Sequence, residues 1–210
     1  MKRFALLLLA LLGALACSRG QAPSPSASPA APELQAAYFA GGCFWCMQYA
    51  FDRVKGVKKT IVGYTGGKVA SPSYEDVSSG TTGHAESIEV LFDPAEVSYA
   101  KLLDTFWMNI DPTTVDREFA DEGTQYRTVI FYQSDAQKQA ALASRSALAK
   151  SGKFKDPIAT QIVPVGNFYP AEDYHQEYYK KNPAHFNAYE VGSGRAGYIE
   201  RTWGAAATKP

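Results

Sequence analysis

The sequence predicts an α+β domain, and three observations support this class. Segments with the period-two pattern of strands and segments with the 3.6-residue pattern of helices occur in mixed order, without the strict strand–helix–strand repetition of a doubly wound parallel sheet. Aromatic residues make up 13% of the chain, which is typical of a packed core and opposite to disordered sequences. The length of 210 residues suits one domain with appendages, and no internal repeat divides it.

Five segments are expected to form strands because they are rich in β-branched residues or alternate between apolar and polar positions. The clearest alternation places Ile88, Val90 and Phe92 on one face. The expected strands are 35–40, 57–64, 87–92, 126–132 and 158–165.

Four segments are expected to form helices. The first carries Phe44, Met47, Phe51 and Val54 at steps of three, four and three, which makes one apolar helical face. Long Gly- and Tyr-rich loops join the elements, and such loops commonly carry functional residues. The expected helices are 43–54, 98–107 with Ser98 as N-cap, the Ala-rich 134–150 with Ser134 at its start, and the Tyr-rich 172–181.

Charge and cysteine content exclude two classes of protein. The chain has 21 Lys and Arg against 21 Asp and Glu, so its formal net charge is zero. Binding to nucleic acid needs an excess of clustered basic residues, and we expect no such partner. Three cysteines are too few for disulfide bonds to be the main stabilisation of a fold of this size. Any thiols are therefore expected to be chemical rather than structural.

The first residues have the pattern of an export signal. Lys2 and Arg3 precede an apolar run that is too short to span a membrane. Three interpretations of Cys17 are open: cleavage by an ordinary signal peptidase just before it, lipidation of Cys17 in a lipobox-like context, or an incidental cysteine. Residues 18–32 are mostly Pro, Ala and Ser, which predicts a tether and favours the lipoprotein.

We therefore expect three regions and an extracytoplasmic location in the periplasm or cell envelope. The regions are a signal peptide at 1–16, a lipidation site and tether at 17–32, and a catalytic domain at 33–210. Contact with a membrane is expected only through the lipid anchor.

The motif Gly-Gly-Cys-Phe-Trp-Cys at 41–46 stands where the first strand ends and the first helix begins. A thiol in the first turn of a helix lies at its positive end, which favours the thiolate of Cys43. Cys46 lies three residues on, on the same helical face and within disulfide reach. A lone Cys-x-x-Cys can also be half of a zinc site or two buried thiols. No second pair exists and the three histidines are irregularly spaced, so redox thiols are favoured over a metal site.

Two carboxyl groups are further candidates. Glu86 enters a strand and is either an ordinary surface residue or, if buried among aromatic residues, a protonated hydrogen-bond donor. Asp121 lies in a loop that leads into a strand, and the local sequence assigns it no role.

Five motifs in order resemble those of the peptide methionine sulfoxide reductase A family, and the similarity runs from about residue 39 to 203. They are Gly-Cys-Phe-Trp at 42–45, Gly-Tyr-Thr-Gly-Gly at 63–67, Pro-Ser-Tyr at 72–74, Gly-His-Ala-Glu at 83–86 and Gly-Thr-Gln-Tyr-Arg at 123–127. For the fold, the expectation is a two-layer mixed β-sheet with flanking helices, a ferredoxin-like core with elaborations.

The resemblance implies reduction of methionine-S-sulfoxide, free or in proteins, to methionine. Cys43 would attack the sulfoxide sulfur and become a sulfenic acid, which a second thiol converts to a disulfide. The other implied roles are proton donation to the sulfoxide oxygen by Glu86, further donation by Tyr74 and Tyr126, organisation of the thiol by Asp121, and an apolar seat for the substrate methyl group from Phe44 and Trp45.

The sequence departs from many family members at two positions. Cys46 stands where Gly is common, and no cysteine follows it, so Cys46 is the candidate resolving thiol within the domain. Gln48 stands where Glu is common, without an evident meaning. The resemblance further implies a monomer without a bound cofactor, recycled by thioredoxin or a thioredoxin-like protein.

Alternative functions compete with this interpretation. A thioredoxin-like disulfide exchanger also uses Cys-x-x-Cys, but it would have a cis-proline loop and would leave Glu86 and Tyr74 without a role. An envelope metal-binding module would use Cys43, Cys46 and a histidine. A purely structural lipoprotein would need no thiol at a helix start.

Overall fold

The computed structural model describes residues 33–204. The predicted signal peptide, the lipidation site at Cys17 and the tether lie outside these residues. Within the described part of the chain, no helix is both long enough and apolar enough to cross a membrane.

A six-stranded mixed sheet forms the centre of the domain, in the order β7-β6-β1-β3-β2-β8. All neighbouring strands are antiparallel except β6 and β7, which are parallel. This mixed sheet with its helices confirms the predicted α+β class. The strands are β1 Gln35–Gly41, β2 Val57–Thr65, β3 Ala85–Phe92, β6 Thr128–Tyr132, β7 Gln161–Pro164 and β8 Tyr169–Pro170.

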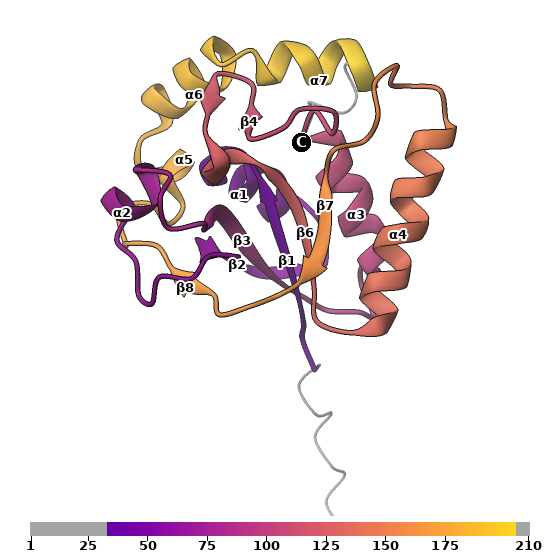
Figure 1. Cartoon of the computed structure of the whole chain (residues 1–210), viewed down its shortest axis with the longest axis horizontal. Helices are drawn as coiled ribbons and strands as arrows, with labels where there is room; N and C mark the ends of the chain where they lie inside the picture. Colours follow the sequence, from indigo (N-terminus) through magenta and orange to yellow (C-terminus); the bar gives the residue numbers. More distant parts are fainter. Residues whose placement is uncertain (1–32, 205–210) are drawn as a thin grey trace, which may run out of the picture. The chain divides into compact units, whose positions relative to one another are not determined.

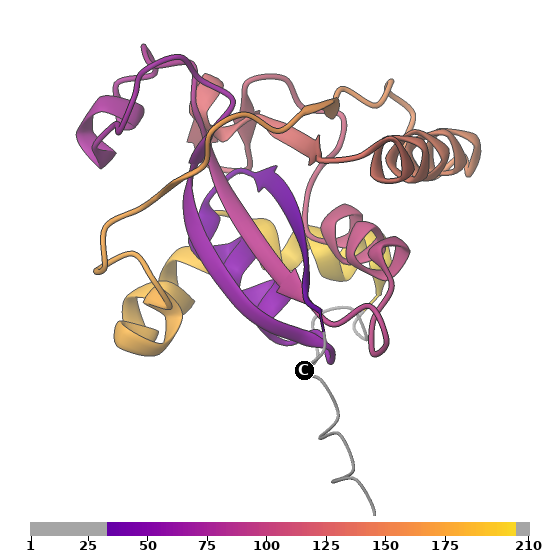
Figure 2. The ribbon, with the colours of Figure 1, turned by 90° about the horizontal axis from the view of Figure 1, so that it is seen from below.

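Four of these strands and two helices form the expected ferredoxin-like core. The helix α1 (Phe44–Asp52) follows β1, and α3 (Tyr99–Met108) follows β3, while the strand order in the middle of the sheet is β6-β1-β3-β2. The two helices contact each other and lie on one face of the sheet (Figures 1 and 2). β1 is therefore a central strand, and its end places the first turn of α1 inside the domain.

Stacked aromatic rings join β1 to the helices that cover it. The Phe39 ring lies 5.0 Å from the Phe51 ring of α1 and 5.2 Å from the Phe106 ring of α3, centroid to centroid. All three side chains are buried. Such aromatic contacts add to the stabilisation from buried area, so the orientation of α1 on the sheet is set by the core.

The two predicted serine caps are present. The Ser98 hydroxyl accepts a hydrogen bond from the Lys101 amide at the start of α3. The Ser134 hydroxyl does the same for Gln137 at the start of α4 (Asp135–Lys150). Each cap satisfies one of the amide groups that a helix start leaves unpaired.

Several segments differ from the sequence-based expectation; the strand expected over 158–165, for example, is limited to β7 (Gln161–Pro164). The loop expected at 66–79 contains a short helix, α2 (Tyr74–Ser78), which begins with a capping box between Ser73 and Asp76. The strand expected to begin at Tyr126 begins at Thr128. Before it, a 3₁₀ turn, η1 (Thr124–Tyr126), follows Gly123, whose φ of +130° suits glycine alone.

The helix expected over 172–181 is mostly a series of turns, and only α5 (Tyr178–Lys181) is helical. The amide of Gln176 explains this, because it pairs with both backbone groups of Val62 on β2, at 3.0 Å and 2.9 Å. This contact holds the tail against the sheet instead of letting it coil.

The remaining elements lie around the end of the sheet where α1 begins. They are β4 (Arg117–Glu118), β5 (Asp121–Glu122), α6 (Pro183–Gly192) and α7 (Arg195–Trp203). The helices α6 and α7 run along this side of the domain (Figure 1).

The structure gives Gln48 a meaning that the sequence did not provide. Its side chain is fully buried. It donates to the Thr60 hydroxyl of β2 at 3.0 Å and accepts from the Glu177 amide at 2.6 Å. A buried amide that is paired at both ends is stabilising. Gln48 thus ties the C-terminal segment to α1 and β2.

Candidate active site

A small cavity of about 120 Å³ lies at the start of α1. It brings together seven of the residues singled out in the sequence, although they come from five separate segments. Its lining consists of Cys43, Phe44, Trp45, Tyr74, Glu86, Asp121, Tyr126 and one residue that the sequence did not suggest, Tyr189. Cys46 lies outside this lining, in a buried cluster with Cys43 and Phe186.

Cys43 is the N-cap residue of α1, and the two glycines before it make this position possible. A Cβ on Gly41 would lie 2.6 Å from the Met47 sulfur, and one on Gly42 would lie 2.5 Å from Cβ of Glu118. Gly42 also has a φ of +72°, in the left-handed region. Any larger residue at either position would displace the turn that presents the thiol.

The Cys43 thiol is in an environment that favours its neutral form. Burial raises its pKa well above the ordinary value, and Cys46 and Asp121 raise it further, while Arg195 lowers it. The sequence-based expectation of a lowered pKa at the helix start is therefore not met in this state, because desolvation outweighs the helix end. No disulfide bond joins Cys43 and Cys46 in this structure.

Glu86 is buried, with 4% of its surface exposed, and its carboxylate oxygen accepts a hydrogen bond of 3.1 Å from the Phe44 amide. Burial raises its pKa well above the ordinary range, and the nearby Cys43 raises it further. Burial thus favours the protonated form of this carboxyl. Of the two interpretations open from sequence, the buried donor is the one that this geometry fits.

Asp121 is held by a residue that the sequence analysis missed. The Tyr189 hydroxyl of α6 donates to its carboxylate. Burial raises the pKa of Asp121, while the bond from Tyr189 and the charge of Arg195 lower it. Tyr189 lies 68 residues further along the chain. The only signal for it was the tyrosine-rich composition of the tail, which does not single out one residue.

Tyr74 and Tyr126, the two other predicted donors, each lie at one end of a short helical element. Tyr74 begins α2, and its amide donates to Glu172 at 2.8 Å. Tyr126 ends η1. Burial raises the pKa of both phenols, so both remain hydrogen-bond donors across the neutral range.

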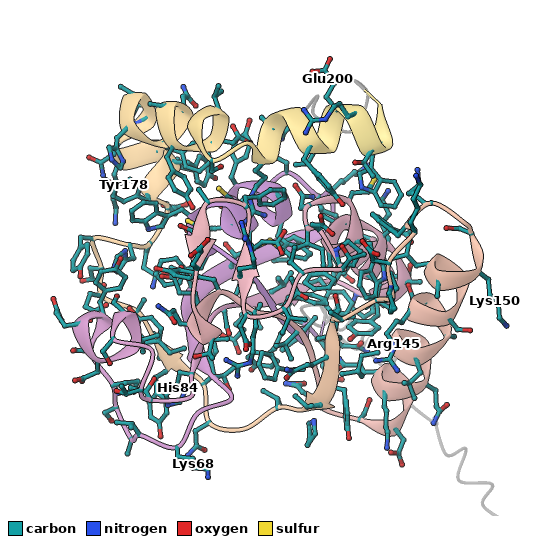
Figure 3. The ribbon with its side chains drawn as sticks, turned by 45° about the horizontal axis from the view of Figure 1, so that its top comes forward. Lys68, His84, Arg145, Lys150, Tyr178 and Glu200 are labelled. Carbon is teal, nitrogen blue, oxygen red and sulfur yellow. The ribbon has the colours of Figure 1, made fainter. Side chains whose placement is uncertain are left out.

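Trp45 is fixed by two residues of the C-terminal segment. Its indole N–H donates to Nδ1 of His175 at 3.1 Å. Its ring stacks on Tyr178, at 3.8 Å between centroids and 7° between planes. Tyr178 belongs to α5 and is labelled in Figure 3. The sequence had offered His175 only as a metal ligand, and the structure gives it this positioning contact instead.

The other histidines are engaged elsewhere. The ring of His84 accepts from the Gly67 amide through Nδ1 and contacts the Val69 carbonyl through Nε2. His185 contacts the Tyr178 hydroxyl. Among the described residues, no cluster of three or more His, Cys, Asp or Glu side chains could hold a metal ion.

A thiol, a protonated carboxyl and two phenols that face one cavity can attack an electrophilic sulfur and donate a proton to its oxygen. Comparisons with known proteins agree with this chemistry. The sequence pattern of the family described as peptide methionine sulfoxide reductase matches residues 35–207.

Individual relatives and solved structures agree as well. The peptide methionine sulfoxide reductase MsrA of Bacillus subtilis (strain 168) is 54% identical over 169 residues, which cover 80% of this chain and 96% of that protein. The crystal structure of reduced Mxr1 from Saccharomyces cerevisiae is similar with a TM-score of 0.69 and 33% identity, covering 75% of this chain and 89% of that one. Mxr1 in complex with Trx2 is similar with a TM-score of 0.50 and 26% identity, covering 74% and 91%. The chain therefore belongs to the peptide methionine sulfoxide reductase family and is an oxidoreductase that returns methionine sulfoxide to methionine.

Proposed function

We propose that the chain reduces methionine-S-sulfoxide, free and in proteins, through a sulfenic acid on Cys43 and a Cys43–Cys46 disulfide. The observation that carries this proposal is the cavity itself, in which the Cys43 thiol and the buried Glu86 carboxyl line the same 120 Å³. A space of this size suits the end of a methionine side chain.

The proposed chemistry uses two thiols and one oxygen atom. The Cys43 sulfur attacks the sulfoxide sulfur, the oxygen passes to Cys43, and methionine leaves, so that one sulfoxide is reduced and one thiol becomes a sulfenic acid. The Cys46 thiol then attacks the Cys43 sulfur and water leaves. The product is a disulfide, which needs two electrons from an external dithiol.

Glu86 is the proposed proton donor to the sulfoxide oxygen. Its pKa is raised by burial, so it holds a proton where an exposed carboxyl would have lost it. Tyr74 and Tyr126 are the proposed additional donors, which would stabilise charge on the oxygen in the manner of an oxyanion hole. The alkaline phenol pKa values keep both of them as donors.

Trp45 and Phe44 form the proposed seat for the substrate methyl group. The Trp45 ring is held by its bond to His175 and by its stack on Tyr178, so the seat is rigid before substrate arrives. The thiol, the acid and this seat lie at three fixed places. Only one sulfoxide epimer can present its oxygen to Glu86 while its sulfur faces Cys43.

This three-point arrangement gives the direct test of the proposed function. We expect the purified, reduced protein to convert the S epimer of a blocked methionine sulfoxide to the thioether and to leave the R epimer unchanged. Chromatography of the two separated epimers measures this. Reduction of both epimers at equal rates would contradict the three-point seat.

Asp121 and Tyr189 are proposed to organise the thiol. We expect Asp121→Asn to shift the pH profile of thiol alkylation to lower pH and to change the rate of methionine release, because it removes a negative charge that raises the pKa of Cys43. Tyr189→Phe removes the hydroxyl that holds Asp121 and should change the profile in the same sense. Asp104→Asn, a carboxyl on α3 with an exposed side chain, is the matched control. Profiles and rates equal to wild type in both test variants would exclude the role.

A thioredoxin-type protein is the proposed reductant. The similarity to the yeast protein that was solved in complex with Trx2 supports this choice. No bound cofactor enters the scheme, since the two cysteines and an external dithiol account for both electrons.

The envelope is the proposed location, with repair of oxidised envelope proteins as the task. The support is the basic start, the short apolar run and the Pro/Ala/Ser-rich segment before residue 33. The mass of the mature N-terminus tests the anchor, because acyl chains on Cys17 add a mass that simple cleavage does not.

A further inference from the structure

Arg195 is a fully buried cation that the proposed chemistry leaves without a role. It is the first residue of α7, and 2% of its surface is exposed. An arginine is almost never buried to this degree unless it is paired or fully hydrogen-bonded. The contacts of its guanidinium therefore indicate what it is there to hold.

The guanidinium lies directly behind the turn that presents Cys43. Nη2 donates to the Gly41 carbonyl at 2.8 Å, and Nη1 donates to the Asn109 carbonyl. Nη1 also lies 3.8 Å from the Met47 sulfur. Gly41 ends β1 and Met47 lies in α1, so one planar side chain touches the elements on both sides of Cys43.

The positive charge is shared with few neighbours. Glu118 lies against Gly42, and burial raises its pKa to about 8 although Arg195 lowers it. It is therefore mostly neutral at pH 7. Glu190 of α6 also has its pKa raised by burial, again against the influence of Arg195. Burial thus disfavours the charged form of both carboxyls that lie near the guanidinium.

The groups that remain to interact with this charge are those of the active site. The two thiols and the Tyr189 phenol raise the pKa of Arg195. In return, Arg195 lowers the pKa of Cys43 and of Asp121. Glu86, which also lines the cavity, has its pKa raised by burial and by charge on Cys43. Arg195 is a cation that lowers the pKa of the Cys43 thiol.

We propose that Arg195 is a positioning residue for sulfoxide reduction: from behind the active-site turn its guanidinium fixes the Gly41 and Asn109 carbonyls and places a positive charge beside the turn that presents Cys43. This rests on the proposed role of Cys43 as nucleophile. An arginine suits the task because its planar fork donates to two carbonyls at once and stays charged when buried.

The positive charge of Arg195 offsets part of the free-energy cost of forming the Cys43 thiolate in a buried site. Burial of Cys43 disfavours the thiolate that must attack the sulfoxide, and a helix end alone does not offset this. A cation placed behind the thiol, outside the cavity, lowers that cost without occupying space that the substrate needs. Arg195 does not line the cavity and is not expected to contact the substrate.

The test is a titration of one thiol in variants of Arg195. Cys17→Ser and Cys46→Ser are combined as the parent protein, so that alkylation by iodoacetamide reports on Cys43 alone. We expect Arg195→Met to raise the apparent pKa of Cys43 by about one unit, the lower end of what a nearby opposite charge does. Release of methionine in the first turnover at pH 7 should fall about tenfold, in proportion to the thiolate fraction.

Two further variants separate charge from structural support. Arg195→Lys keeps the charge but not the fork, so the alkylation profile should stay at the parent position while the first-turnover rate is lower than in the parent. Arg201→Met removes an exposed arginine from the same helix and should match the parent in both measurements. Glu200, another exposed residue of α7, is labelled in Figure 3 and points away from the domain.

The proposal is overturned if Arg195→Met, folded by near-ultraviolet circular dichroism, has the alkylation profile of the parent. If that variant does not fold, Glu118→Gln decides. It keeps an acceptor for the Asp111 amide and removes the carboxylate that balances Arg195 above pH 8. The apparent pKa of Cys43 should then fall, and an unchanged or higher value overturns the proposal. The alkylation needs no sulfoxide, so a failure of the proposed function would be seen separately, as a lack of methionine release.

Discussion

Cys46→Ser is expected to release about one methionine per enzyme molecule and then to stop when a thioredoxin-type protein is the only reductant. Cys43→Ser is expected to release none. The reason is the placement of the two thiols. Cys43 lines the cavity as the N-cap of α1, whereas Cys46 lies one turn further on, buried beside it and outside the lining. Of the two thiols only Cys43 lines the cavity in which we propose that the substrate binds, and Cys46 is its proposed partner for the disulfide.

The measurement is a rapid-quench assay of methionine formed per enzyme, followed by steady-state turnover. Dithiothreitol should restore cycling to Cys46→Ser, because a small thiol can reduce the sulfenic acid directly. Cys17→Ser is the matched control and should cycle like wild type. Full cycling of Cys46→Ser with the protein reductant would contradict the proposed disulfide. Cys43 and Cys46 are the only cysteines in residues 33–204, so no other thiol of the domain could replace Cys46.

Glu86→Gln is expected to slow the first turnover by about 10²-fold, the usual value of one proton-transfer step. The amide can still donate a hydrogen bond to the sulfoxide oxygen but cannot transfer a proton. Because the carboxyl and the amide are similar in size and burial favours the neutral form of Glu86, folding should be little affected. The control is Glu89→Gln, on the same strand but pairing with Tyr38 away from the cavity.

The pH dependence gives an independent check on Glu86. The wild-type protein needs Glu86 protonated, and burial raises its pKa, so the first-turnover rate should decline as pH rises through that raised pKa. In Glu86→Gln this alkaline decline should disappear, leaving only the rise that follows ionisation of Cys43. A variant with the same alkaline decline as wild type would assign the proton to another group.

Several features could be predicted from the sequence because they depend on short-range patterns. The apolar steps of Phe44, Met47 and Phe51 predicted α1, and all three side chains are buried in it. The serines before α3 and α4 predicted their caps, since capping joins residues three apart. The motif at 41–46 likewise placed Cys43 at a helix start, because its two glycines are local requirements of that turn.

The C-terminal segment could not be predicted in the same way. Its composition favoured a helix over 172–181, but Gln176 bonds to the backbone of Val62, more than a hundred residues earlier. The meaning of Gln48 was hidden for the same reason, because its partner Glu177 is distant in sequence. No local pattern encodes which distant group will satisfy a buried amide.

The sequence by itself predicted the α+β class, and it carries the family motifs and the two candidate thiols, because each of these is visible in local patterns. Only the tertiary structure decided their chemical state. Burial, which depends on what packs around a group, makes Glu86 neutral and raises the pKa of Cys43 against the influence of its helix end. The tertiary fold also brings Tyr189 into contact with Asp121, and Arg195 into contact with Gly41, across long stretches of chain. Desolvation and long-range contacts are properties of the assembled core, so no single segment carries them.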